Sequence, residues 1–183
     1  EFRRVLFRSC SESSRLDIPD DAVTYSFPLT MIMREGVHNQ SENRNHGASM
    51  IGTDYISFFD ADDVMHPQRI QWIRHCLPFS DMIVHSYTMQ TPYVFRPIDV
   101  PTMYLNAIIE APSGCLIFEP ELYAPIHHSQ VTVRGSLFGK VRFDERPEVV
   151  RREDCIFCCD ILRQPGVECA YIADPLSWYR LTH

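Results

Sequence analysis

Three aspartates lie within four positions directly behind an apolar run, in the stretch YISFFDADDVMHPQRI, residues 55–70. Asp60, Asp62 and Asp63 repel one another at this spacing, so each carboxylate has to stay hydrated or find a partner. A divalent cation is a common partner for such a cluster, because hard cations take oxygen ligands. The alternative is an acidic turn before a helix, with Asp63 as a cap and Pro67 in the first turn. The stretch alone leaves both interpretations open.

The elements that must position these acids follow from the hydrophobic pattern. Residues 54–59 (DYISFF) and 81–89 (DMIVHSYTM) predict strands, the first of the nearly continuous apolar type found in covered sheets. Between them, Ile70, Ile73 and Leu77 are spaced three and four apart, which predicts a helix. A strand, a helix and a strand in succession favour an α/β layered fold.

The remaining segments carry weaker signals. Residues 42–50 predict a helix that Gly52 ends, and residues 23–27 a short strand. The proline-rich residues 91–114 predict an irregular excursion, and residues 129–143 one or two short strands or a strand and a turn. Residues 152–166 predict a helix with two acids in its first turn, and residues 169–183 two short strands around Asp174-Pro175.

Composition narrows the class of protein. The chain has 183 residues, enough for one domain, and its net charge of −7 gives no basic face for nucleic acid. No apolar run reaches the roughly 20 residues of a membrane span, and no signal-peptide pattern is visible. Seven cysteines without framework spacing predict reduced thiols and a cytoplasmic protein. A zinc site near Cys155, Cys158, Cys159 and Cys169 is the alternative to packing on a helix face, which we favour.

The first nine residues, EFRRVLFRS, are short, basic and uncapped. They predict a non-native or disordered leader at residues 1–9, with one domain over residues 10–183.

Four segments, in order, resemble the glycosyltransferases of the GT-A fold, and most closely glycosyltransferase family 2. They are the helix segment NRNHGA, the strand and Asp-x-Asp motif YISFFDADD, the Glu-Asp helix start RREDCIF, and the closing DPLSWYRLTH. The resemblance covers residues 43–183 and implies an α/β fold with a mixed, mostly parallel sheet flanked by helices. The family's first β-α-β unit, which holds the nucleobase, has no counterpart that the sequence identifies.

The resemblance also implies roles for individual residues. Asp62, Asp60 and His183 would bind Mn²⁺ or Mg²⁺, and Asp63 would assist them or cap the next helix. Arg44, Asn45, Asp60 and Arg180 would contact the donor nucleotide. Asp154 would be the general base, with Glu153 as a supporting acid.

The implied function is metal-dependent, inverting transfer of a sugar, of the hexosyltransferase type. The donor would be a UDP- or GDP-sugar and the acceptor a hydroxyl of a glycan, lipid or protein. Two alternatives stay open. DADDV also fits the Asp-x-Asp-x-Val signature of haloacid-dehalogenase-like phosphatases, in which Asp60 is a nucleophile and Asp62 a general acid. The chain could also be a non-catalytic nucleotide-sugar binder with the same fold.

Overall fold

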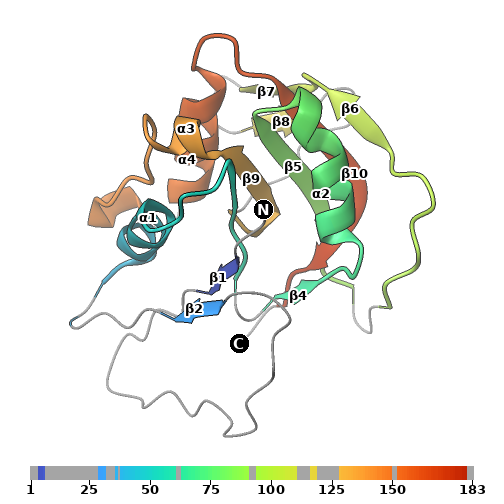
Figure 1. Ribbon diagram of the computed structural model, residues 1–183, viewed down its shortest axis with the longest axis horizontal. Coiled ribbons are helices and arrows are strands. Elements are labelled where there is room, and N and C mark those ends of the chain that lie inside the picture. Colours follow the sequence, from blue (N-terminus) through green and yellow to red (C-terminus); the bar gives the residue numbers. More distant parts are fainter. Residues whose placement is uncertain are drawn as a thin grey trace, which may run out of the picture.

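The computed structural model describes residues 4–6, 29–31, 36, 38–60, 63–90, 94–110, 116–118, 128–149 and 152–180. Within them, a mixed sheet of six strands forms the centre of the molecule (Figure 1). Its strands are β3 (Tyr55–Ser57), β4 (Val64–Met65), β5 (Met82–Thr88), β6 (Met103–Leu105), β9 (Val131–Arg134) and β10 (Cys169–Trp178). The order is β3-β9-β5-β10-β4, and β6 also pairs with β10.

Helices and smaller strand pairs surround this sheet. The helices are α1 (Gln40–Ser49), α2 (Arg69–Cys76), α3 (Gly135–Phe138) and α4 (Glu153–Leu162), with short 3₁₀ turns η1 (Leu77–Phe79), η2 (His128–Gln130) and η3 (Pro147–Val149). The smaller pairs are β1 (Arg4–Leu6) with β2 (Leu29–Met31), which is parallel, and β7 (Ile108–Glu110) with β8 (Leu116–Phe118), which is antiparallel. None of the described helices is long and apolar enough to cross a membrane.

The pairing pattern confirms a mixed sheet, but most of its strand pairs are antiparallel rather than parallel as expected. Only β5 and β10 pair in parallel within the six-stranded sheet, and the other described pairings are antiparallel. The reason is the path of β9, which returns after a long excursion and enters between β3 and β5, antiparallel to both. Local patterning carries no information on such a distant partner.

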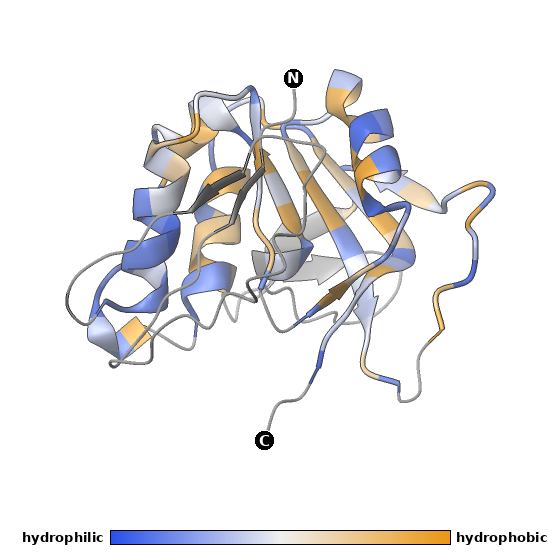
Figure 2. Cartoon of the chain, turned by 60° about the horizontal axis from the view of Figure 1, so that its bottom comes forward, coloured by the Kyte–Doolittle hydropathy of each residue, from blue (hydrophilic) through white to orange (hydrophobic). Residues whose placement is uncertain are grey.

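Alternation along the central strands divides the core between the two faces of the sheet. On β5, Met82 and Val84 pack in one cluster with side chains of α1, α3 and α4, whereas Ile83 packs in a second cluster with α2. On β10, Tyr171 belongs to the first cluster and Ile172 to the second. Figure 2 shows the two groups of helices on either side of the sheet, with hydrophobic residues along the strands between them.

The predicted helices and the predicted strands at β3 and β5 are found, with two differences elsewhere. β10 is one strand rather than two, and its register with β5 shifts around Pro175. The proline lies between the residues that pair with β6 and those that pair with β4, and the register with β5 is irregular on both sides of it, so the ladder is interrupted where the N–H is missing. Residues 129–143 form β9 followed by the short helix α3.

Two predictions concern the N-terminal part. β1 lies inside the nine residues that we expected to be a leader, and its backbone pairs with β2. The domain boundary at residue 9 stays a prediction. The strand expected at residues 23–27 lies outside the described residues.

Candidate active site

The acid loop, residues 58–63, leaves the end of β3. The Asp60 N–H donates to Ser129 Oγ at 2.9 Å, and the Asp63 N–H returns to the Asp60 carbonyl at 3.4 Å. The Asp60 side chain is 35% exposed, so its carboxylate can receive a ligand. Asp62, the metal ligand expected from sequence, lies outside the described residues.

Arg44 connects the acid loop to the start of α4. A capping box made by Asn39 and Glu42 fixes the first turn of α1, and Arg44 projects from the next turn. Its Nη1 donates to Glu153 Oε1 at 2.8 Å, and its Nη2 lies 4.0 Å from Asp60 Oδ1. The guanidinium also lies over the Phe143 ring, 5.4 Å from its centroid. Arg44, from the helix segment NRNHGA, therefore lies next to both the Asp-x-Asp motif and the Glu-Asp helix start.

Glu153 and Asp154 have different surroundings despite being adjacent. The Glu153 side chain is only 5% exposed and is held by Arg44. Asp154 is half-buried, and its Oδ1 accepts from the Cys155 N–H at 2.8 Å. Both acids lie in the first turn of α4, where the helix dipole favours negative charge. The base role of Asp154 and the supporting role of Glu153 stay predictions.

The closing segment also reaches the acid loop. The Arg180 N–H donates to Asp63 Oδ1 at 3.3 Å, and the Arg180 guanidinium lies 5.9 Å from the Trp178 ring centroid. Two roles were expected for Asp63, assisting the metal ligands or capping the next helix, and the capping role is wrong. That helix begins at Arg69 with Gln68 as its N-cap, too far along the chain for Asp63 to serve. The contact of Arg180 with a nucleotide stays a prediction.

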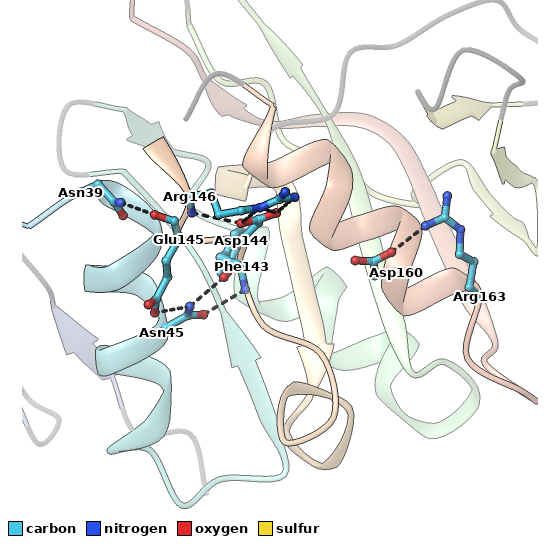
Figure 3. Close-up of polar contacts among 8 residues, drawn as sticks. All are labelled: Asn39, Asn45, Phe143, Asp144, Glu145, Arg146, Asp160 and Arg163. Carbon is cyan, nitrogen blue, oxygen red and sulfur yellow. Dashed lines mark hydrogen bonds and ion pairs between the residues drawn. The ribbon is translucent and has the colours of Figure 1, made fainter. Parts of the chain in front are cut away.

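Asn45 lies one residue from Arg44 but faces a different partner (Figure 3). Its Nδ2 donates to the Phe143 carbonyl and to Glu145 Oε1, both at 2.8 Å, and its Oδ1 accepts from the Phe143 N–H at 3.0 Å. Asn39 Nδ2 donates to the Glu145 carbonyl at 2.8 Å. These bonds explain Asn45 as a clip between α1 and the segment before α4, and its contact with a nucleotide stays a prediction.

Of the three expected metal ligands, the structure describes only Asp60. Among the described residues, no group of three or more His, Cys, Asp and Glu side chains could hold a metal ion, and His183 lies outside them together with Asp62. The partly exposed Asp60 carboxylate is a hard oxygen donor of the kind that Mg²⁺ and Mn²⁺ accept, so the donor chemistry fits.

The cysteines are explained by packing rather than by zinc. Cys158, Cys159 and Cys169 lie in the larger core cluster. Burial raises the pKa of the Cys169 thiol to about 12 and that of Cys158 well above its usual value, as expected for thiols packed among apolar side chains. The preference for helix packing is confirmed.

Sequence reasoning missed Arg69, a residue with 1% exposure that lies directly behind the acid loop. A signal was available, because Arg69 is in register with Ile73 and Cys76, the buried positions of α2. An arginine at such a position on a helix has to find acceptors inside the protein.

Comparisons with known proteins bear on the family and the fold of the chain. Residues 5–74, which contain α1 and the acid loop, match the family model "Glycosyl transferase family 2". No curated protein matches the chain.

Among solved structures, the fold is similar to that of S. aureus TarS 1–349 in complex with UDP-GlcNAc. The TM-score is 0.69 at 14% identity, over 100% of this chain and 50% of that one. The complex of the same TarS fragment with UDP gives a TM-score of 0.67 at 15% identity, over 100% of this chain and 52% of that one. The chain thus spans about half the length of the structures it matches. The chain therefore has the GT-A glycosyltransferase fold, and its residues 5–74 are similar to glycosyltransferase family 2.

Proposed function

We propose that this chain transfers a sugar from a nucleoside-diphosphate donor to an acceptor hydroxyl, in an inverting and metal-dependent reaction. The observation that carries the proposal is the meeting of the four motif segments at one place. Arg44 lies between Glu153 and Asp60, and the Arg180 backbone reaches Asp63. A donor site needs such a mixture of fixed cations and carboxylates, because its leaving group is a diphosphate.

The residues at this place divide into a donor side and an acceptor side. Asp60 and Asp62, with His183, would hold the divalent ion, which neutralises the charge that builds on the departing diphosphate. Arg44, already desolvated beside Asp60, supplies a second positive group for that charge. On the acceptor side, Asp154 would take the proton of the attacking hydroxyl. Asp154 is half-buried in the first turn of α4, and its Oδ1 accepts from the Cys155 N–H.

The structures of TarS with UDP and with UDP-GlcNAc support a UDP-sugar as the first donor to test. GDP-sugars are the second, since the residues that read the base are not identified. The acceptor class, a glycan, lipid or protein hydroxyl, is not narrowed further by the described residues.

The test is release of nucleoside diphosphate from UDP- and GDP-sugars in the presence of Mn²⁺. We expect slow hydrolysis of a donor that disappears in Asp60→Asn, and no release of phosphate from an aryl phosphate. Steady aryl phosphatase activity that depends on Asp60 would favour the dehalogenase-like alternative. Nucleotide binding without any turnover would favour a non-catalytic binder.

A further inference from the structure

One arginine side chain is enclosed beneath the acid loop. Arg69 Nη2 donates to Ser57 Oγ at 2.9 Å, to the Phe58 carbonyl at 3.2 Å, and to the Ser129 carbonyl at 3.1 Å. Its Nε donates to His85 Nε2 at 2.8 Å. The guanidinium thus joins the end of β3, the turn η2 and the strand β5 at one point.

These bonds lead directly to Asp60. Ser129 accepts twice, through its carbonyl from Arg69 and through its Oγ from the Asp60 N–H. Phe58, whose carbonyl also binds Arg69, is two residues before Asp60 and is itself held by the Val131 carbonyl through its N–H, at 3.1 Å. The guanidinium therefore fixes the backbone on both sides of the point where β3 becomes the acid loop.

The charge of Arg69 is as notable as its bonds. Within the described part of the chain, the atoms that accept its hydrogen bonds are all neutral. His85 is one of them: its Nδ1 lies 2.8 Å from the Ser86 carbonyl and must donate, so Nε2 is the unprotonated nitrogen. Burial lowers the pKa of Arg69 to about 9, which leaves it a cation at neutral pH, and the Asp63 carboxylate favours that charged form.

Burying a cation without a hydrogen-bonded carboxylate costs desolvation free energy, so a buried arginine at this position needs an explanation. The acid loop supplies one, because a fixed positive charge close to the two described carboxylates, Asp60 and Asp63, reduces the repulsion between them. We propose that Arg69 is a positioning residue for donor binding, one that holds the Asp60 backbone in place and offsets the charge of the acid loop. The donor part of this inference rests on the proposed function.

The experiment compares Arg69→Lys, which keeps the charge but loses the planar fork, with Ser129→Ala, which keeps Arg69 and deletes the acceptor of the Asp60 N–H. Arg163→Lys, an exposed arginine paired with Asp160, is the matched control (Figure 3). Two quantities are measured: amide hydrogen exchange by NMR, and the affinity for UDP with Mn²⁺.

In Arg69→Lys and Ser129→Ala, we expect exchange at the Asp60 amide to rise about tenfold or more relative to the Ala173 amide of β10. Affinity for UDP with Mn²⁺ should fall about 10–100-fold, the usual effect of losing a group that orients metal ligands. Arg163→Lys should stay within about twofold of wild type on both measurements. An arginine that only stabilised the fold would raise exchange in β10 as much as at Asp60.

Each result decides the inference. Exchange and affinity unchanged in both variants would overturn it, and so would faster exchange at Asp60 without loss of affinity. If Arg69→Lys loosens the whole sheet, Ser57→Ala decides instead, because it keeps the buried charge and removes one side-chain acceptor of the Arg69 guanidinium. Faster exchange at Asp60 with weaker UDP affinity in Ser57→Ala then supports the role of Arg69, and no change in either overturns it. If wild type binds neither UDP nor GDP with Mn²⁺, the proposed function fails and the donor part of the inference fails with it. The exchange measurement then still decides whether Arg69 orders the acid loop.

Discussion

At the scale of single residues, the ion pair between Arg44 and Glu153 explains most about the site. Both side chains are nearly removed from solvent, at 11% and 5% exposure. A pair in that environment is coupled more strongly than a surface pair, and removing one partner leaves the other charge buried and uncompensated. We therefore propose that Glu153 holds Arg44 near Asp60, and its role as a supporting acid stays a prediction.

A double-mutant cycle tests this coupling. Arg44→Met and Glu153→Gln, alone and combined, should give a coupling free energy of about 2 kcal/mol in the free energy of unfolding, measured by urea denaturation. The control cycle uses the exposed pair Asp160 and Arg163, for which we expect less than about 0.5 kcal/mol because solvent screens it. A coupling for the inner pair no larger than for the control would contradict the assignment.

Asp154 can be tested separately, because a base that acts only on the acceptor affects transfer and not donor binding. In Asp154→Asn, transfer or donor hydrolysis should fall by roughly 10²–10⁴-fold. Binding of UDP with Mn²⁺ should stay within about twofold of wild type. Asn can still accept the hydrogen bond from the Cys155 N–H, so the melting temperature should change little. Transfer within twofold of wild type would show that Asp154 is only a helix-end acid.

At the scale of elements, the turn from β9 into α3 packs closely against the segment that precedes the edge strand β3. The Gly135 N–H donates to the Asp54 carbonyl at 2.7 Å, which brings the glycine against the segment before β3. A Cβ at position 135 would lie 2.6 Å from the Thr53 carbonyl oxygen, a backbone atom that cannot rotate away. Only glycine allows this approach.

Gly135→Ala should therefore lower the free energy of unfolding by about 1–3 kcal/mol, the range for overpacking in a tight environment. Gly139→Ala is the matched control, because a Cβ there would meet the Ser136 carbonyl at an ordinary 3.5 Å and its φ of −64° suits alanine. Thermal or urea unfolding of both variants measures the difference. Equal stability of the two would show that α3 moves away from Thr53 without cost.

The helix α4 gives a pH prediction through the core it packs against. Burial raises the pKa of the Cys169 thiol from 9.0 to about 12. The unfolded chain ionises this thiol first, so its contribution to stability is complete below about pH 9 and is lost progressively between pH 9 and 12. Cys169→Ala should flatten the decrease in stability over that interval, as measured by urea denaturation at several pH values. An unchanged slope would mean that the thiol is not desolvated as described.

At the scale of the whole molecule, the sequence predicts features that depend on neighbouring residues and misses those that depend on residues far apart in the chain. β3, α2, β5 and α4 were predicted because local periodicity and helix-end acids mark them. The insertion of β9 between β3 and β5, and the single strand β10, were not, because the paired strands lie far apart in the sequence, as Ile56 and Val133 do.

The site divides in the same way. The acid loop, Arg44 and the Glu-Asp pair were expected as separate motifs, whereas their meeting at Arg44 depends on how α1 and α4 pack beside the sheet. The clip at Asn45 and the buried Arg69 were missed because their partners lie in distant segments.

The account's central claim is that this place binds a nucleoside diphosphate together with a divalent ion. The most direct measurement is the melting temperature with UDP, GDP, Mn²⁺ and each nucleotide combined with Mn²⁺, for wild type, Asp60→Asn, Asp62→Asn and the surface control Asp160→Asn. We predict that the combination stabilises wild type more than the sum of the separate ligands. A ligand at about 100 times its dissociation constant stabilises the folded protein by about 2.7 kcal/mol in total, which sets the scale. The synergy should be retained in Asp160→Asn and lost in Asp60→Asn and Asp62→Asn. No synergy in wild type, or equal synergy in all four proteins, would contradict the claim.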